Sequence, residues 1–117
     1  MRSFGYAVEG LGVMLRTQPN FLVHLTAAVV VIVLGIVVRL TAAEFALVAL
    51  TIAVVLVVEC LNTAVESMCD LVSPGFHPLV KRAKDVSAAA VLIAAAASVT
   101  IAALLFFPHV LTFLSGR

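Results

Sequence analysis

Charged residues are scarce in this sequence. Asp, Glu, Lys and Arg make up 11% of its 117 residues, whereas about 25% is usual in soluble domains. Hydrophobic residues make up 64% of the chain, so the composition indicates folding in a lipid bilayer rather than around a water-soluble core. The net charge of +1 gives no basis for binding nucleic acid. The length suggests a single domain, residues 1–117.

The sequence also lacks the features of a disulfide-linked or secreted chain. Its two cysteines, Cys60 and Cys69, fall on opposite faces of one predicted helix, about 13.5 Å apart along the axis. A disulfide needs Cα atoms within about 7 Å, so we expect both thiols to be reduced. The first sixteen residues, MRSFGYAVEGLGVMLR, contain no continuous apolar core and therefore do not fit a signal peptide. We find no repeats and no linkers.

Long runs without charge are the main structural signal. Residues 17–38 and 86–116 contain no Asp, Glu, Lys or Arg, and each run exceeds the roughly 20 residues that cross a bilayer as a helix. A third run, 45–58, covers only about 21 Å as a helix. That helix can cross the bilayer only if it continues through Glu59. The sequence therefore predicts three spanning helices, one of which carries charge into the membrane.

The first residues are predicted to form an amphipathic helix on the membrane surface. Phe4, Val8, Leu11 and Leu15 share one face of this helix, and its charged residues lie largely off that face. We thus predict an all-α membrane protein with an N-terminal surface helix and three transmembrane helices. The predicted ranges are about 2–16 for the surface helix and about 20–39, 43–72 and 79–107 for the spans, with the sequence FPH ending the last span.

Basic residues predict the orientation of these spans. If the N-terminus is cytoplasmic, five Lys and Arg residues lie on the cytoplasmic side and two lie outside, in agreement with the positive-inside rule. The five are Arg2, Arg16, Lys81, Arg82 and Lys84, and the two are Arg39 and Arg117. The cytoplasmic end of the second span then contains its polar residues.

A polar stripe runs along that second span, in the segment VLVVECLNTAVESMCD. At about 100° per residue, Glu59, Asn62, Glu66 and Asp70 fall within about 80° of arc. Glu66 and Asp70 could simply mark the interfacial end of the helix. A charge inside the bilayer costs at least about 2.5 kcal/mol. For Glu59, this cost favours the interpretation that the stripe is a functional polar site.

The residues of the stripe suit phosphate chemistry. A carboxylate against an apolar wall suits a general base, and a second one nearer the surface suits Mg²⁺ bound together with substrate phosphates. The amide of Asn62 can orient either neighbour. Lys84, followed by Asp85 at the start of the third span, is a candidate for binding phosphate. Lys81 and Arg82 are more simply explained as basic residues that anchor the helix at the membrane surface.

Other polar residues receive simpler interpretations. His24, early in the first span, is interpreted as a hydrogen-bonded packing histidine, with a role in lining the site as the alternative. Glu44 is expected to be a solvated charge near a helix N-terminus. His109 is expected on the opposite side of the membrane from the polar stripe.

The segments ECLNTAVE and SPGFHPLVKRAKDVSAAAV together resemble the small prokaryotic diacylglycerol kinases, a family that includes undecaprenol kinases. The resemblance covers about residues 2–107 without gaps. Its core is similar to the pattern E-x-x-N-[ST]-A-[IV]-E followed by H-x-x-x-x-x-A-K-D. It implies a homotrimer with shared active sites that phosphorylates a membrane lipid alcohol with ATP and Mg²⁺ at the inner face of the bacterial cytoplasmic membrane.

The resemblance also implies roles for individual residues. Glu59 matches the family's catalytic base and Asn62 its active-site amide, while Glu66 matches a glutamate that binds the metal. Lys84 and Asp85 match a pair that contacts the nucleotide. One departure concerns Gln18 in TQPNF, which stands where many members have a second metal-binding Glu. Its amide can offer a carbonyl oxygen but no negative charge, so the expectation is either weaker metal binding or a contribution from another acid, such as Glu9 or Asp70.

The expected substrate is undecaprenol, because LNTA and SPxxHPL look more like the undecaprenol kinase branch. Diacylglycerol is the alternative within the family, since its kinases more often have Ser in place of Thr63. A small proton-coupled exporter or a membrane assembly subunit is the alternative from another class, because such proteins also use a glutamate inside the membrane. Neither an exporter nor an assembly subunit would need the Lys84–Asp85 pair at the same depth in the membrane as the polar stripe.

Overall fold

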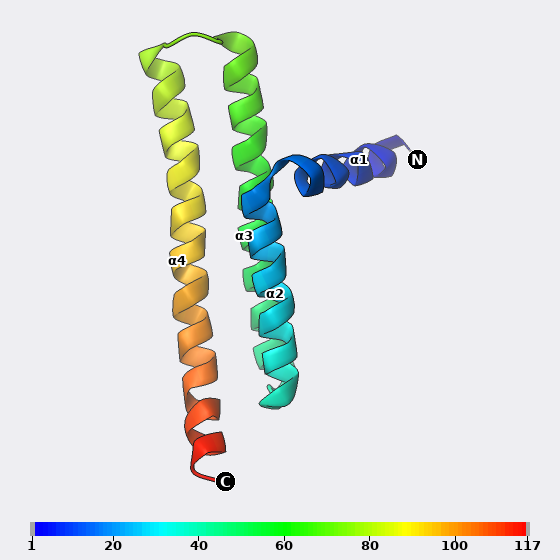
Figure 1. Cartoon of the computed structure of the whole chain (residues 1–117), viewed down its shortest axis with the longest axis vertical. Helices are drawn as coiled ribbons and strands as arrows, with labels where there is room; N and C mark the ends of the chain where they lie inside the picture. Colours follow the sequence, from blue (N-terminus) through cyan, green and yellow to red (C-terminus); the bar gives the residue numbers. More distant parts are fainter. Residues whose placement is uncertain (1, 117) are drawn as a thin grey trace.

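The computed structural model describes residues 2–116, which form four α-helices joined by short turns (Figure 1). The helices are α1 (Arg2–Thr17), α2 (Pro19–Val37), α3 (Ala42–Val72) and α4 (Pro78–Leu114). Helices α2, α3 and α4 are long and apolar enough to cross a membrane. No strand occurs in this part of the chain. The prediction of an all-α protein with three spans and a further N-terminal helix is therefore confirmed.

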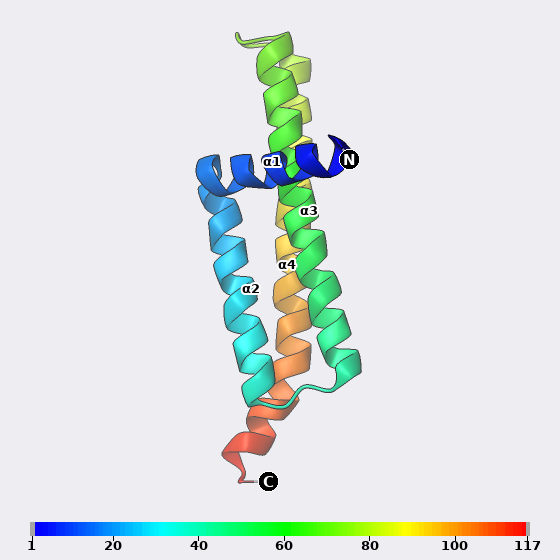
Figure 2. The same ribbon diagram turned by 90° about the vertical axis from the view of Figure 1, so that its right-hand side faces the viewer.

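Helix α1 lies across the bundle rather than along it (Figures 1 and 2). Apolar residues such as Phe4 and Leu11 are exposed, while Met14 is buried and holds the end of the helix against the bundle. An amphipathic helix in this position fits one that lies in the plane of the membrane interface. The turn at Gln18 then redirects the chain into the bilayer.

Helices α3 and α4 form a long antiparallel hairpin, and α2 packs along only part of α3 (Figure 1). At 1.5 Å per residue, α2 is about 28 Å long, α3 about 46 Å and α4 about 55 Å. The hydrocarbon core of a bilayer is about 30 Å thick. The closed end of the hairpin therefore extends beyond α2, past the level of α1 (Figure 2).

The ends of these helices follow from local sequence. Thr41 caps α3 by accepting a hydrogen bond from the backbone amide of Glu44 at 3.2 Å. His77 caps α4 in the same way, because its Nδ1 accepts from the amide of Leu79 at 3.1 Å, and Pro78 occupies the first helical position. The His77 cap fixes the start of α4 directly after the loop SPGFHP, at the closed end of the hairpin.

Helix α4 does not end at FPH, so the expected end at residue 107 is wrong. It continues through Pro108 to Leu114. Proline removes one backbone hydrogen bond, which transmembrane helices tolerate. His109, directly after the proline, contacts Glu44 of α3 with Nε2 and Oε2 2.7 Å apart. Glu44 is therefore paired rather than simply solvated, and the pair holds the last turns of α4 against α3.

Few residues of the described chain are buried, and large apolar side chains are exposed on every helix. Lipid or another protein surface must cover them. Cys60 and Cys69 are free, as predicted. Among residues 2–116, Glu59 is the charged residue that is buried, with 3% of its surface exposed.

Candidate active site

Glu59 lies where α3 meets the first turns of α2. Its Oε1 is 3.1 Å from Nε2 of His24, and the two side chains are 4% and 25% exposed. The two groups are not aligned as a hydrogen bond, so Oε1 has no hydrogen-bond partner among residues 2–116. The carboxylate is thus buried, with the imidazole of His24 as the polar group next to Oε1. His24 lies beside the predicted site residue, as the alternative interpretation proposed.

Asn62 links the polar stripe to α4. Its Nδ2 donates to Oε1 of Glu66 at 3.3 Å, and its Oδ1 accepts a hydrogen bond from the hydroxyl of Ser87. The amide therefore orients Glu66, as the sequence suggested it could. Sequence reasoning missed Ser87, although its position three residues after Lys84 places it on the same side of α4.

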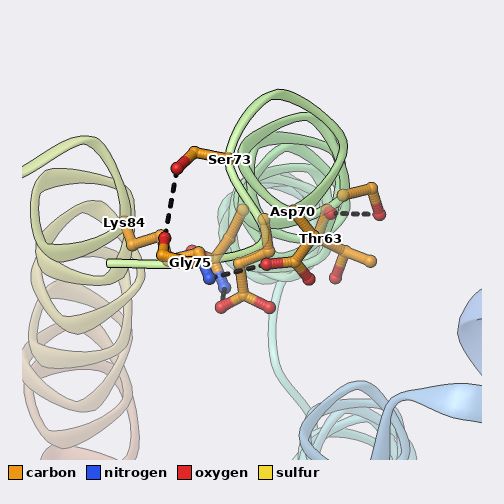
Figure 3. Close-up of polar contacts among 8 residues, drawn as sticks. Thr63, Asp70, Ser73, Gly75 and Lys84 are labelled. Carbon is orange, nitrogen blue, oxygen red and sulfur yellow. Dashed lines mark hydrogen bonds and ion pairs between the residues drawn. The ribbon is translucent and has the colours of Figure 1, made fainter. Parts of the chain in front are cut away.

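Lys84 extends from α4 to Asp70 of α3, with Nζ and Oδ1 2.7 Å apart (Figure 3). Asp85 does not pair with Lys84; it accepts from Lys81, one turn earlier, at 2.6 Å. The structure therefore joins Lys84 to the acidic stripe and turns Asp85 to a separate partner.

The polar residues lie at two depths. Asp70 follows Glu59 by eleven residues, which corresponds to about 16 Å along the helix axis. Glu59 lies beside the start of α2, whereas Asp70 and Lys84 lie in the part of the hairpin that extends beyond α2. In the same region, the hydroxyl of Ser73 donates to the carbonyl of Gly75 at 3.1 Å and stabilises the loop (Figure 3).

Gln18, like Asp85, is a predicted site residue that does not join the stripe within one chain. It precedes α2 at the turn, and its Nε2 donates to the hydroxyl of Thr17 at 3.3 Å. No three His, Cys, Asp or Glu side chains of residues 2–116 converge on a metal position. The second oxygen of Glu66, Oε2, accepts no hydrogen bond from these residues. One such carboxylate fits Mg²⁺, which proteins commonly bind through one or two carboxylates plus phosphates.

Two apolar hollows adjoin the level of Glu59. One, of about 90 Å³, lies among α2, α3 and α4 and has His24 in its wall. The other, of about 230 Å³, lies among α1, α2 and α3 and is lined by Leu11, Phe21, Leu56, Val57, Cys60 and Leu61. Leu56, three residues before Glu59, lines both hollows, whereas Glu59 itself lines neither.

Comparison with known proteins agrees with this arrangement. The family model for prokaryotic diacylglycerol kinase matches residues 5–106. The chain belongs to this family. It is 42% identical over 111 residues to a diacylglycerol kinase of Synechocystis, and the match covers 94% of the chain but only 63% of that protein. It is 39% identical over 107 residues to the undecaprenol kinase of Bacillus subtilis, covering 92% of the chain and 87% of that protein.

A more distant relative is the diacylglycerol kinase of Escherichia coli, 29% identical over 109 residues, with 93% of the chain and 89% of that protein covered. The resemblance stated from the two motifs is therefore confirmed. Membership identifies the chain as a lipid kinase of the membrane, with ATP as the phosphoryl donor. It decides against an exporter or an assembly subunit.

Proposed function

We propose that this protein transfers the γ-phosphoryl group of ATP to undecaprenol at the cytoplasmic face of the bacterial cytoplasmic membrane. Its identity to the Bacillus subtilis undecaprenol kinase, over most of the length of both proteins, supports this substrate. Diacylglycerol is the second candidate, because the Synechocystis diacylglycerol kinase is 42% identical to the chain. The basic residues near the N-terminus and at the closed end of the hairpin support the orientation.

The observation that carries the proposal is the buried carboxylate of Glu59 beneath a charged, exposed end of the same hairpin. Phosphoryl transfer requires alignment of the reactants and stabilisation of charge on the transferred group. In the proposed reaction, Glu59 accepts the proton of the lipid hydroxyl as that hydroxyl attacks the γ-phosphorus. Lipid reaches Glu59 from the apolar side, and ATP occupies the charged side.

The other residues bind and orient the nucleotide. Lys84 is 40% exposed and lies 2.7 Å from Asp70, so its ammonium group can exchange this partner for a phosphate oxygen. Asp85 contacts the nucleotide, with Lys81 as its present partner. Asn62 fixes the orientation of Glu66. Mg²⁺, when bound by Glu66 with Gln18 as a weaker oxygen ligand, supplies neutralisation of phosphate charge.

We further propose that the active protein is a homotrimer with sites formed between protomers. Gln18 does not meet Glu66 within one chain, so a second protomer would have to supply one of the two. Apolar side chains near the closed end of the hairpin, among them Leu71 and Phe76, are 77% and 81% exposed. Beyond the level of α1 such side chains would meet water unless another copy covered them.

Purified protein in lipid nanodiscs tests the proposal. ADP should form only when a lipid alcohol is added, and undecaprenol should give a higher kcat/KM than diacylglycerol in parallel assays. Glu59→Gln should lower kcat by at least about 100-fold, the lower range for general-base catalysis. The matched control is Glu44→Gln at the opposite end of α3, which should retain activity. Turnover of Glu59→Gln within tenfold of the parent would exclude Glu59 as the base.

A further inference from the structure

Two buried side-chain atoms have no hydrogen-bond partner within residues 2–116, and they lie one helical turn apart on α3. They are Oε1 of Glu59, which lies 3.1 Å from Nε2 of His24 without the alignment of a hydrogen bond, and Oγ1 of Thr63. Buried polar atoms are normally paired, because leaving one unpaired costs free energy. Two such atoms on neighbouring positions therefore indicate a place where a polar group from outside the chain binds.

Thr63 differs from the other threonines of the spanning helices. Thr26, Thr51 and Thr100 each donate a hydrogen bond from Oγ1 to the carbonyl four residues earlier, at 2.7 to 2.9 Å. This is the usual way in which a helix satisfies a threonine hydroxyl. Thr63 makes no such bond. Its hydroxyl is therefore available to donate to another group.

The spacing of the two residues suits a bridging hydroxyl. Residues four apart on a helix lie on the same face, with Cβ atoms about 5–6 Å apart. A ligand hydroxyl carries one donor and can also accept. It can thus donate to Oε1 of Glu59 and accept from Oγ1 of Thr63, which satisfies both atoms at once.

The surroundings of the pair suit the rest of a lipid. In the view of Figure 3, Thr63 lies farther from α4 than Asp70 does, next to the Lys84–Asp70 pair. The hollow of about 230 Å³ among α1, α2 and α3 has in its wall Leu56 and Cys60. These two residues precede Glu59 and Thr63 by three positions each, so the hollow lies about one helical turn from the pair.

We propose that Thr63 holds the hydroxyl of the lipid substrate against Glu59, which makes Thr63 a catalytic residue of the lipid site. The proposal rests on the proposed kinase activity with Glu59 as base. In the reaction, the lipid O–H bond breaks and its proton passes to Glu59. The lipid oxygen forms a bond to the γ-phosphorus, the bond to the β-phosphate oxygen breaks, and ADP leaves. Thr63 recognises the primary alcohol that undecaprenol and diacylglycerol share.

Two substitutions at this position and one control test the proposal. Thr63→Val removes the hydroxyl and keeps the shape, Thr63→Ser keeps the hydroxyl, and Thr51→Val removes a satisfied hydroxyl of the same helix. We expect Thr63→Val to lower kcat/KM for the lipid alcohol by about tenfold or more, the effect of one lost hydrogen bond in a reacting complex. The KM for ATP should not change. Thr63→Ser and Thr51→Val should both retain activity.

Thermal stability separates this role from a structural one. Since the hydroxyl has no hydrogen-bond partner among residues 2–116, Thr63→Val should unfold at the same temperature as the parent or higher. Activity of Thr63→Val within threefold of the parent would overturn the proposal, as would a loss of stability that Thr63→Ser restores. If Glu59→Gln is inactive while Thr63→Val is fully active, the Thr63 role fails alone. If Glu59→Gln is active, the proposed base fails as well.

Discussion

At the scale of single residues, the site depends on one acid placed where water is scarce. Glu59 is almost fully buried, and the side chain that meets its Oε1 is that of His24. An uncompensated buried charge is strongly destabilising, so the histidine contributes to keeping the carboxylate in this position. The polar residues near the hairpin's closed end, by contrast, are exposed and exchange partners at little cost.

We expect His24→Ala to affect both turnover and stability. The substitution removes the contact to Glu59 and leaves a cavity, so it should lower the free energy of unfolding by about 1–3 kcal/mol. kcat should fall while the KM for ATP stays constant, because the nucleotide residues lie farther out. Steady-state kinetics and thermal denaturation in the same detergent measure both effects. Unchanged kcat would show that Glu59 does not need this neighbour.

Glu66→Gln should raise the Mg²⁺ concentration needed for half-maximal activity by about tenfold or more, because a neutral amide binds a hard cation less well. One oxygen of this carboxylate accepts from Asn62 and the other accepts no hydrogen bond from the described residues, so its charge is available for the proposed Mg²⁺. A Mg²⁺ titration at saturating ATP measures the shift, with Glu44→Gln as the matched control. An unchanged requirement would place the metal on other residues.

At the scale of helices, sequence patterns predicted the ends of the spans to within two residues, apart from the C-terminal end of α4. Charge-free runs located α2 and α4, and the stripe of Glu59 to Asp70 correctly required one continuous helix through its acids. The end of α4 was missed because the expectation that a helix ends near a proline considers only the neighbouring residues. It could not anticipate that His109 would meet Glu44, sixty-five residues earlier. The same limit applies to Asp70 and Lys84, whose pairing depends on the register between α3 and α4.

The Glu44–His109 pair gives a prediction that concerns the helices and not the chemistry. Glu44→Gln and His109→Gln should each lower the free energy of unfolding by about 1–2 kcal/mol, and the double variant should lose less than the sum. Lipid kinase activity should stay within a few-fold of the parent, since the Glu44–His109 pair and Lys84 lie at opposite ends of the α3–α4 hairpin. Additive losses of stability would show that the two side chains do not act together.

At the scale of the whole molecule, one chain presents more apolar surface than it covers. Sequence composition predicted a membrane protein, and the exposed apolar side chains on all four helices agree with it. Composition cannot distinguish surface covered by lipid from surface covered by another copy, because both environments are apolar. The partner of Gln18 could not be predicted for the same reason, since it depends on how protomers meet.

Mixing two inactive variants tests whether sites are shared. Glu59→Gln and Lys84→Ala should each be inactive alone. When they are dissociated, mixed and reconstituted together, activity should reappear if Glu59 and Lys84 of one site come from different protomers. ADP release with lipid alcohol measures recovery, and each variant mixed with itself is the control. No recovery from a demonstrably mixed oligomer would mean that each site takes both residues from a single chain.

Because the α3–α4 hairpin is longer than α2, one part of it can lie in lipid while its closed end lies in water. In the proposed reaction, the triphosphate of ATP remains hydrated at the closed end of the hairpin. The lipid has to bring only its hydroxyl, at the depth of the headgroups, to the triphosphate. We then expect the choice of substrate to depend mainly on the depth in the membrane at which a molecule places its hydroxyl. Tails that differ widely in chemistry but anchor at the same depth would compete for one position.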